Sequence, residues 1–463
     1  MPALTIAALA LYLAAVLAIG FAWRKRAGRN QVSYFVADRS LNAFWGFLGL
    51  ASLTTGGSTT IALAALVYTH GIAGLWLDLS GALGLLVLGL FFARRVRREE
   101  AVTLPEIVGR AYGLAARRVA AFLVLASEIV WFALLTEATQ VVLTAAFGLE
   151  PNRAIVLSTA VFVAYTALGG QYAVVRTDLL QYGLMVVGLP GVALACALRG
   201  AHGLGGLPAS AWSFPTSPTF SAGDAVAMLV LVGLPHVVGS DVYLKLSSCR
   251  DEAVARRSAL LAAGSKVLFG LSVAAIALAA RKALPPVAPE SVLPAAVLGF
   301  APPALAALVL VALVATMQTS ADIVLLSASA VTARDLAPPV TGGRPMSIAA
   351  TRLLPVVYGA LGLVTALALD RDVLRTLRLG YSIFAAGLIL PTLAALAPER
   401  FRVPTRGAIA AMVAGGAAAV TGRFAPALSG GRDPVLIGTG VNALVLFAAY
   451  ALRGRTVKVP RRP

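Results

Sequence analysis

The chain consists largely of long apolar stretches separated by short polar loops. A membrane-spanning helix requires roughly 20 mostly apolar residues, and the sequence offers thirteen such stretches. Because 59% of the residues are hydrophobic and only 13% are charged, we expect an all-α integral membrane protein without a soluble domain. The predicted spans are approximately 2–22, 41–69, 72–93, 119–148, 154–170, 177–198, 222–241, 258–280, 303–333, 351–370, 376–397, 407–422 and 434–452.

The distribution of basic residues predicts the orientation of these spans. A net charge of +18 is compatible with nucleic-acid binding, but the Lys and Arg residues fall in short loops instead of one domain. With the N-terminus outside, 28 of the 38 Lys and Arg residues lie on one side of the membrane. The positive-inside rule makes that side the cytoplasm. We therefore expect a multi-pass protein of the cell inner (plasma) membrane with a cytoplasmic C-terminus and no nucleic-acid partner.

Two of the predicted spans contain helix breakers near their middles. The second span contains "TTGGSTT" (54–60), where two glycines weaken the helix, and the seventh contains "VGLPHVVGSD" (232–241), where Pro235 removes a backbone donor. Either break alone is compatible with a packing kink. The two breaks begin successive sets of five spans, which is typical of an inverted-repeat transporter whose site lies at the breaks. We expect one transporter domain over 1–463, with repeats at 41–198 and 222–397.

Five sequence segments resemble a known transporter family in order and spacing. They are "YFVADRSLNAFWGFLGLASLTTGGSTT" (34–60), "TLPEIVGRAYG" (103–113), "GGQYAVVRTDLLQ" (169–181), "DVYLKLSSCRDEAVARRS" (241–258) and "MQTSADIVLLSASAVTARDL" (317–336). They resemble the sodium/solute symporter family of proline, pantothenate and sugar carriers. The resemblance implies a leucine-transporter fold with a 5+5 inverted repeat, one extra N-terminal helix, two C-terminal helices and commonly 13 spans. It also implies Na⁺-coupled transport, so an enzyme is not expected.

Hydroxyl-bearing residues in the ninth span predict a cation site. Thr316, Thr319 and Ser320 share one helix face, and the break in the second span frees backbone carbonyls. The resemblance maps a Na⁺ site onto the carbonyls of Ser52, Thr55 and Thr316 and the side chains of Thr319 and Ser320. The alternative is that these hydroxyls only bond to the preceding helical turn.

Two carboxylates predict a second cation or proton position. Asp178, in "RTDLLQ", resembles a family residue near a second cation, and Asp322 is expected to face the same region. Ionised groups within a membrane are costly, at about 2.5 to 3.5 kcal/mol on insertion scales. The pair is therefore expected to share a Na⁺ or a proton, unless Asp178 is an ordinary helix-end residue. Glu128 and Glu137 are interpreted as internal hydrogen-bonding groups.

The substrate pocket is expected between the two breaks, lined by the second, third, seventh, eighth and eleventh spans. The candidate substrate-binding residues are Thr59, Asp78, His236 and Lys266. Asp78 resembles a substrate-contacting position of the sugar carriers. Lys266 is equally compatible with a side chain that extends to the lipid headgroups, and His236 with a packing role. An acid beside a base suits a zwitterion or a small carboxylate, whereas the short Thr59 and Asp78 side chains disfavour a sugar.

These features predict secondary active uptake of a small polar solute, such as an amino acid, a carboxylate or a vitamin-like compound. The inward Na⁺ gradient would drive this uptake by alternating access. The sequence contains no phosphate-binding P-loop, metal cluster or catalytic triad pattern. A proton-coupled symporter and a membrane solute sensor are the alternatives, and the short tail after the last span disfavours the sensor. The oligomeric state is left open.

Overall fold

The structure is a computed structural model that describes residues 2–199, 204, 206–340, 342, 344–369, 372–397, 401 and 403–452. The described residues form helices and contain no strand, so the predicted all-α fold class is confirmed. The helices are α1 (Pro2–Ala27), α2 (Gln31–Val36), α3 (Ala43–Thr55), α4 (Ser58–His70), α5 (Trp76–Val87), α6 (Ala93–Arg98), α7 (Leu104–Phe147), α8 (Pro151–Arg199), α9 (Ala222–Met228), α10 (Leu234–Val238), α11 (Ser240–Ser247), α12 (Glu252–Ala283), α13 (Val292–Phe300), α14 (Pro303–Val331), α15 (Ala337–Val340), α16 (Ile348–Ala368), α17 (Val373–Leu396), α18 (Thr405–Phe424) and α19 (Pro434–Leu452). Short 3₁₀ or π segments connect several of them, including η3 (Leu88–Phe92), η5 (Leu229–Gly233) and η7 (Thr332–Leu336).

Among the described residues, eleven helical segments are long and apolar enough to cross a membrane. Two of them, Ser58–Arg98 and Pro151–Cys196, are 41 and 46 residues long, which is about twice the length that a bilayer requires. Each contains a glycine with positive φ, Gly71 at 72° and Gly170 at 52°. The sequence predicts a boundary between two spans close to each of these glycines. The count of thirteen spans is not confirmed, and it stays a prediction that the chain crosses twice in each long segment.

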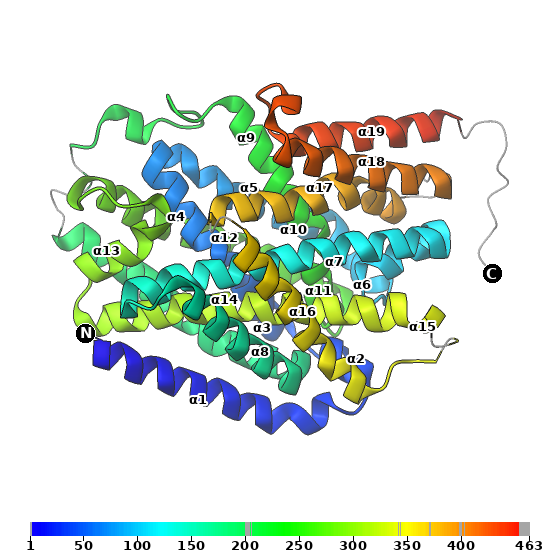
Figure 1. The fold of residues 1–463 in the computed structure, drawn as a ribbon, viewed down its shortest axis with the longest axis horizontal. Coiled ribbons are helices and arrows are strands. Elements are labelled where there is room, and N and C mark those ends of the chain that lie inside the picture. Colours follow the sequence, from blue (N-terminus) through cyan, green and yellow to red (C-terminus); the bar gives the residue numbers. More distant parts are fainter. Residues whose placement is uncertain are drawn as a thin grey trace.

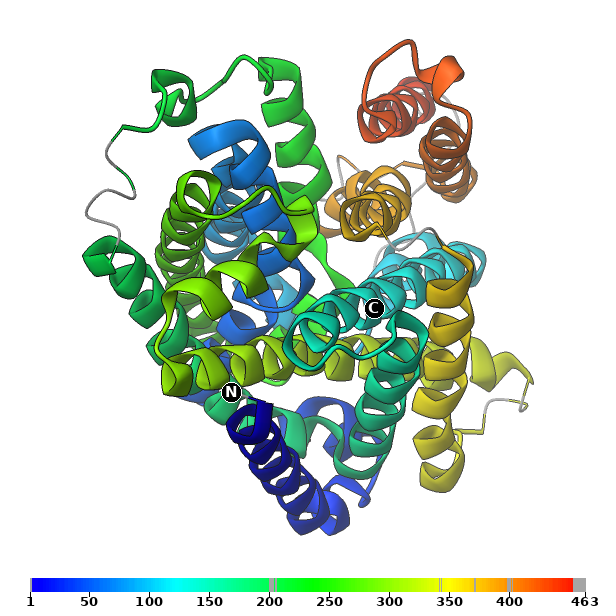
Figure 2. The ribbon, with the colours of Figure 1, turned by 60° about the vertical axis from the view of Figure 1, so that its left-hand side comes forward.

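The helices differ strongly in how much of their surface is buried. Within the apolar window of each span, 83% of α14 and 78% of α17 are buried, against 22% of α1 and 22% of α19. Figures 1 and 2 place α1 at one edge of the bundle and the paired helices α18 and α19 on the opposite side. The first and the last two spans therefore lie at the periphery, and the site must be sought around α14 and α17.

Helix α7 begins well before the predicted span 119–148. It starts at Leu104, and its N-terminus is capped by the Thr103 side chain. The helix is interrupted at Gly113, which has a φ of 84°, a conformation that only glycine adopts readily. The interruption lies close to the predicted boundary, so the two parts can differ in direction within a continuous helical segment.

The first predicted break is present between α3 and α4. Gly56 is extended and Gly57 has a φ of 68°, so the helix stops at Thr55 and restarts at Ser58. A Cβ atom on Gly57 would lie 3.0 Å from the Ser320 hydroxyl and 3.2 Å from the Leu135 side chain. Glycine is therefore required here both for its backbone conformation and for the close approach of α14.

The second break is present, but its predicted position is wrong. Pro235 lies within α10, and the chain leaves helical geometry four residues later, at Gly239 with a ψ of 136°. The π-helical segment η5 precedes the proline. Its wider hydrogen-bond spacing accommodates a residue that lacks an N–H, so the helix continues past Pro235. The break therefore separates α10 from α11 and places Ser240 and Asp241 at the first turn of α11.

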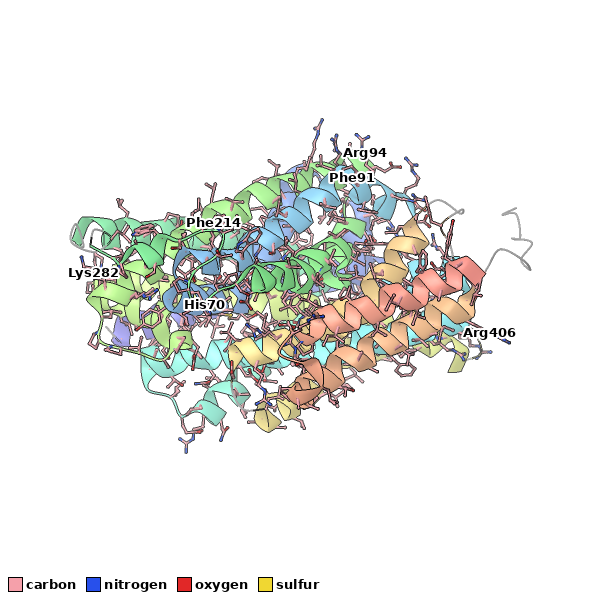
Figure 3. The ribbon with its side chains drawn as sticks, turned by 90° about the horizontal axis from the view of Figure 1, so that it is seen from above. His70, Phe91, Arg94, Phe214, Lys282 and Arg406 are labelled. Carbon is pink, nitrogen blue, oxygen red and sulfur yellow. The ribbon has the colours of Figure 1, made fainter. Side chains whose placement is uncertain are left out.

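Basic residues mark the two ends of the bundle. Figure 3 shows Arg94 and Arg406 toward one end of the molecule and Lys282 at the opposite end. The sequence assigns Arg94 and Arg406 to the cytoplasmic side and Lys282 to the outside. The tail residues 453–463, with Arg453, Arg455 and Lys458, lie outside the described residues.

Candidate functional site

Two small cavities lie between the two helix breaks, with volumes of about 60 Å³ and about 40 Å³. They share lining residues from five elements, which are Leu53 of α3, Thr59 of α4, Trp131 of α7, Asp241 of α11 and Tyr381 of α17. Gly56, Ser58 and Ser320 also line the larger cavity, and His236 also lines the smaller one. Both breaks and the buried helices α14 and α17 therefore meet in one region.

The structure divides the four predicted substrate residues into two groups. Thr59 lines both cavities and donates its hydroxyl hydrogen to the Gly56 carbonyl at 2.8 Å, whereas His236 lines the smaller cavity with its Nδ1 2.8 Å from the Val232 carbonyl. Asp78 and Lys266 line neither cavity. Their side chains form a buried ion pair at 2.8 Å.

The Lys266 ammonium group points into the protein. Its side chain is fully buried, and Nζ donates to the Thr54 carbonyl as well as pairing with Asp78. The extension of Lys266 to the lipid headgroups is therefore excluded. Thr54 lies in the last turn of α3, where the break leaves carbonyls without helical partners. Lys266 thus satisfies one carbonyl that the break has freed.

Three of the five predicted Na⁺ ligands meet at the α3–α4 break. A Cβ atom on Gly56 would lie 2.7 Å from the Thr316 Cβ and 2.9 Å from the Ser52 carbonyl oxygen, and Ser320 approaches Gly57. Helix α14 therefore packs directly against the unwound residues. Thr55 differs from these three, because its carbonyl accepts a hydrogen bond from the Thr60 hydroxyl at 3.1 Å.

The fifth predicted ligand, Thr319, belongs to a buried polar group that includes a lysine the sequence reasoning missed. The Thr319 hydroxyl donates to Asp178, and the Lys245 ammonium group pairs with the other oxygen of Asp178 at 2.6 Å. Lys245 is 2% exposed and Asp178 is fully buried. The available signal was a lone lysine in "DVYLKLSS", directly after the second break, but nothing local indicated its partner.

Asp322 lies in a separate hydrogen-bonding environment. One of its oxygens accepts a hydrogen bond from the Thr166 hydroxyl at 2.6 Å, and the other is buried without a partner among the described residues. The described residues show no direct contact between the carboxylates of Asp178 and Asp322. Asp178 of α8 is therefore paired with an ammonium group, whereas Asp322 of α14 forms no ion pair among the described residues.

The cavities also contain three residues that the sequence reasoning did not propose. The rings of Trp131 and Tyr381 meet edge to face, with centroids 5.0 Å apart and planes at 69°. Asp241 accepts a hydrogen bond from the Val242 backbone at 2.7 Å and, among the described residues, forms no ion pair. Asp241 ended the quoted "VGLPHVVGSD", and Tyr381 belongs to the eleventh span that was expected to line the pocket.

A second carboxylate lies behind Asp241. Glu128 is 1% exposed and accepts a hydrogen bond from the Ser327 hydroxyl at 2.6 Å. The Ser327 hydroxyl is 2.9 Å from that of Ser240, the neighbour of Asp241. This contact agrees with the predicted role of Glu128 as an internal hydrogen-bonding group, although its Oε2 is buried without a partner among the described residues.

Comparison with known proteins finds sequence similarity over part of the chain. The family model described as "Sodium:solute symporter family" matches residues 34–204. The chain is 28% identical to the high-affinity choline transporter 1 of Caenorhabditis elegans over 35% of its length, and 27% identical to the osmoregulated proline transporter OpuE of Bacillus subtilis over 40%. It is 31% identical to the sodium/glucose cotransporter 4 of Danio rerio over 40% of its length. The matches span only 28%, 39% and 28% of these relatives.

Two solved structures have the same fold. A Na⁺-coupled sialic acid symporter in a substrate-bound, outward-open state superposes with a TM-score of 0.83 at 17% identity, covering 99% of both chains. Mhp1, a nucleobase-cation-symport-1 family transporter, has a TM-score of 0.60 at 13% identity, covering 91% of this chain and 94% of the other. The predicted leucine-transporter-like fold class is thus confirmed. Residues 34–204 are thus similar to the sodium:solute symporter family, and the described residues have the leucine-transporter-like fold.

Proposed function

We propose that the protein is a Na⁺-coupled secondary active symporter that imports a small solute by alternating access. The observation that carries this proposal is the packing of Thr316 and of the Ser320 hydroxyl of α14 against the unwound α3–α4 junction, next to the cavities. Unwound carbonyls and hydroxyls in a membrane interior satisfy a cation that has left its water, and they are otherwise costly to bury. The relatives named above are themselves described as transporters, two of them for choline and proline.

The proposed Na⁺ ligands are the carbonyls of Ser52, Thr55 and Thr316 and the hydroxyls of Thr319 and Ser320. Ser320 lines the larger cavity, which would give the ion a path to the solute. The Thr319 hydroxyl hydrogen points to Asp178, so its oxygen lone pairs remain available for a cation. A bound Na⁺ would thereby hold α14 against the break and stabilise one arrangement of the two repeats, 41–198 and 222–397.

The second cation position requires a modified proposal because Asp178 already has an ammonium partner. Lys245 supplies the positive charge that the sequence assigned to a second ion. We propose that transport uses one Na⁺ and that Lys245 replaces the second cation at Asp178. The Na⁺ Hill coefficient would then be close to one in the wild type.

Proton coupling through Asp178 and Asp322 is the second candidate, and one observation favours it. The buried Oδ2 atom of Asp322 lacks a hydrogen-bond partner among the described residues, as a carboxyl that accepts and releases a proton could. Uptake driven by a pH gradient without Na⁺, and lost in Asp322→Asn, would favour this candidate over Na⁺ coupling.

The proposed setting is the plasma membrane, with the N-terminus outside and the C-terminus in the cytoplasm. The asymmetric distribution of Lys and Arg supports this orientation. Labelling of single cysteines introduced at Arg94 and at Lys282 with a membrane-impermeant reagent would test it. We expect labelling from outside at the Lys282 position only.

The test of Na⁺ coupling is solute uptake into proteoliposomes with and without an inward Na⁺ gradient. The panel should contain radiolabelled amino acids, carboxylates, vitamins, amines and sugars. The double variant Thr319→Ala/Ser320→Ala removes two of the five proposed ligand groups, so we expect its half-saturating Na⁺ concentration to rise about tenfold or more, the equivalent of about 1.4 kcal/mol. The matched control is Ser272→Ala/Thr365→Ala, which removes two exposed hydroxyls that bond within their own helices. Unchanged Na⁺ dependence in the α14 variant would disprove the site.

A further inference from the structure

We propose that the transported solute is a small organic cation whose ammonium group is neutralised by Asp241 and enclosed by Trp131 and Tyr381. This inference rests on the proposed function in that the solute must enter the two cavities between the breaks. It replaces the expectation of a zwitterion or carboxylate bound by Asp78 and Lys266.

The first argument for a cationic solute concerns the charges around the cavities. Among the described residues that line either cavity, Asp241 alone has a formal charge, and it has no ion-pair partner. The two ammonium groups near the breaks are already engaged, Lys266 by Asp78 and Lys245 by Asp178. An unpaired carboxylate in a low-dielectric cavity attracts a cation and repels an anion.

Glu128 is a second acidic residue near the cavities. Its carboxyl group is linked to the start of α11 through the hydroxyls of Ser327 and Ser240, and one of its oxygens is buried without a partner among the described residues. Neither Glu128 nor Asp241 forms an ion pair among the described residues. A cationic solute would compensate the negative charge of Asp241 during passage.

The second argument for a cationic solute concerns the aromatic rings. Trp131 and Tyr381 line both cavities, and their planes meet at 69°, so the two rings form adjoining walls of a corner. Rings arranged in this way hold alkylated ammonium groups, because the electron-rich ring faces attract the charge and the ring surface contacts the alkyl groups. Leu53 and Leu135 complete an apolar lining in the larger cavity. The lining thus suits a cation with methyl or methylene groups better than a bare metal ion.

Volume restricts the size of the solute. The cavities measure about 60 Å³ and about 40 Å³ and share five lining residues. A buried water requires about 10 to 15 Å³, so the two cavities together hold on the order of ten water-sized groups or fewer. A compound of the size of choline satisfies this limit, whereas a hexose is larger than the space between the breaks.

A net cation fits better than a zwitterion because the described lining residues include His236 but no lysine or arginine to pair with a carboxylate. Choline and glycine betaine separate these two classes, since they share a trimethylammonium group and differ in the carboxylate. We therefore expect choline to bind more tightly than betaine and D-glucose to remain unbound.

The experiment measures equilibrium binding of radiolabelled choline to the purified full-length protein, with betaine, tetramethylammonium, proline and glucose as competitors. Asp241→Asn should weaken choline binding at least tenfold, and Tyr381→Leu several-fold, while Tyr381→Phe keeps the ring and should stay close to wild type. Glu290→Gln, in the loop before α13, is the matched control for loss of one carboxylate. Thermal unfolding of each variant verifies that it is folded, and the Tyr381 pair retains the test if Asp241→Asn does not fold.

The outcomes separate this inference from Na⁺ coupling. Choline binding that depends on Asp241 supports the inference even if it is the same in Na⁺ and K⁺, a result that would count only against Na⁺ coupling. The inference is overturned if neither choline nor tetramethylammonium binds to the folded protein. It is also overturned if betaine, proline or glucose binds in preference, or if Asp241→Asn and Tyr381→Leu leave choline affinity unchanged.

Discussion

The α3–α4 break and the α10–α11 break meet at the same cavities, but they differ in the ion pairs that the described residues form beside them. At the first break, the Thr54 carbonyl accepts the Lys266 ammonium group, and Lys245 lies beside Gly49 of α3 in its pair with Asp178. At the second break, Asp241 accepts a backbone hydrogen bond and forms no ion pair among the described residues. The two breaks therefore differ in the pairing of their charged groups, and they also differ in backbone geometry, since Gly57 has a φ of 68° and Gly239 a φ of −54°.

This difference distinguishes charged groups that are already paired within the protein from charged groups that a ligand must neutralise. A buried ion pair holds fixed helices together without a ligand, whereas an unpaired carboxylate in a cavity favours the state that contains a cation. The α3–α4 side would then require only Na⁺ at its hydroxyl-lined corner, and the α10–α11 side would require the solute.

The largest expected effect follows from removing Lys245. Lys245→Met leaves Asp178 fully buried without its ammonium partner, so we expect a loss of about 3 to 5 kcal/mol in stability, measured by thermal unfolding in detergent. The double variant Lys245→Met/Asp178→Asn removes both charges and should recover most of the loss. If the single variant is as stable as the wild type, the first break does not depend on a fixed cation and the comparison between the breaks fails.

Removing Lys266 should destabilise the protein in the same way as removing Lys245. We expect Lys266→Met to cost about 3 to 5 kcal/mol, since it leaves both Asp78 and the freed carbonyl without a partner. Solute affinity of the folded double variant Asp78→Asn/Lys266→Met should stay close to that of the wild type. A strong loss of solute affinity there, with normal unfolding, would restore these residues as substrate ligands.

The two break glycines should differ in what they control. Gly57→Ala places a side chain at a φ of 68°, so we expect about 1 to 2 kcal/mol of destabilisation. Gly239 has a φ of −54°, which any residue adopts, but a Cβ there would lie 2.6 Å from an Asp241 carboxylate oxygen. The same Cβ would lie 2.7 Å from the Pro235 carbonyl oxygen, so Gly239→Ala should weaken solute binding and also destabilise the protein. Unfolding and binding measured on both variants test this, and identical profiles would contradict it.

The smallest loss of stability is expected for an ion pair at the surface, which serves as the reference for the buried pairs. Arg98 and Glu252 form two hydrogen bonds of 2.9 Å at the surface, with side chains 72% and 37% exposed. Because water and salt screen such pairs, Arg98→Gln should change stability by less than about 1 kcal/mol. A loss as large as that of Lys245→Met would mean that burial does not explain the importance of the pairs at the first break.

The sequence by itself determined the features that depend on neighbouring residues. Apolar length identified the spans, the adjacent glycines located the first break, and the spacing of Thr316, Thr319 and Ser320 placed hydroxyls on one helix face. These properties follow from helix geometry and from the cost of placing backbone groups in lipid. They hold before any two helices meet, which is why the fold class and the α14 hydroxyls near the break agree with the structure.

Tertiary structure alone decided which charges are paired and which are free. Lys245 and Asp178 lie on α11 and α8, and Trp131, Asp241 and Tyr381 come from three further positions in the chain, so no local pattern indicates that they meet. The second break also lies at Gly239 and not at Pro235, because the preceding π-helical turn accommodates a residue without a backbone N–H. The cost of burying a charge depends on its partner across the helix interface, and that partner is set by packing.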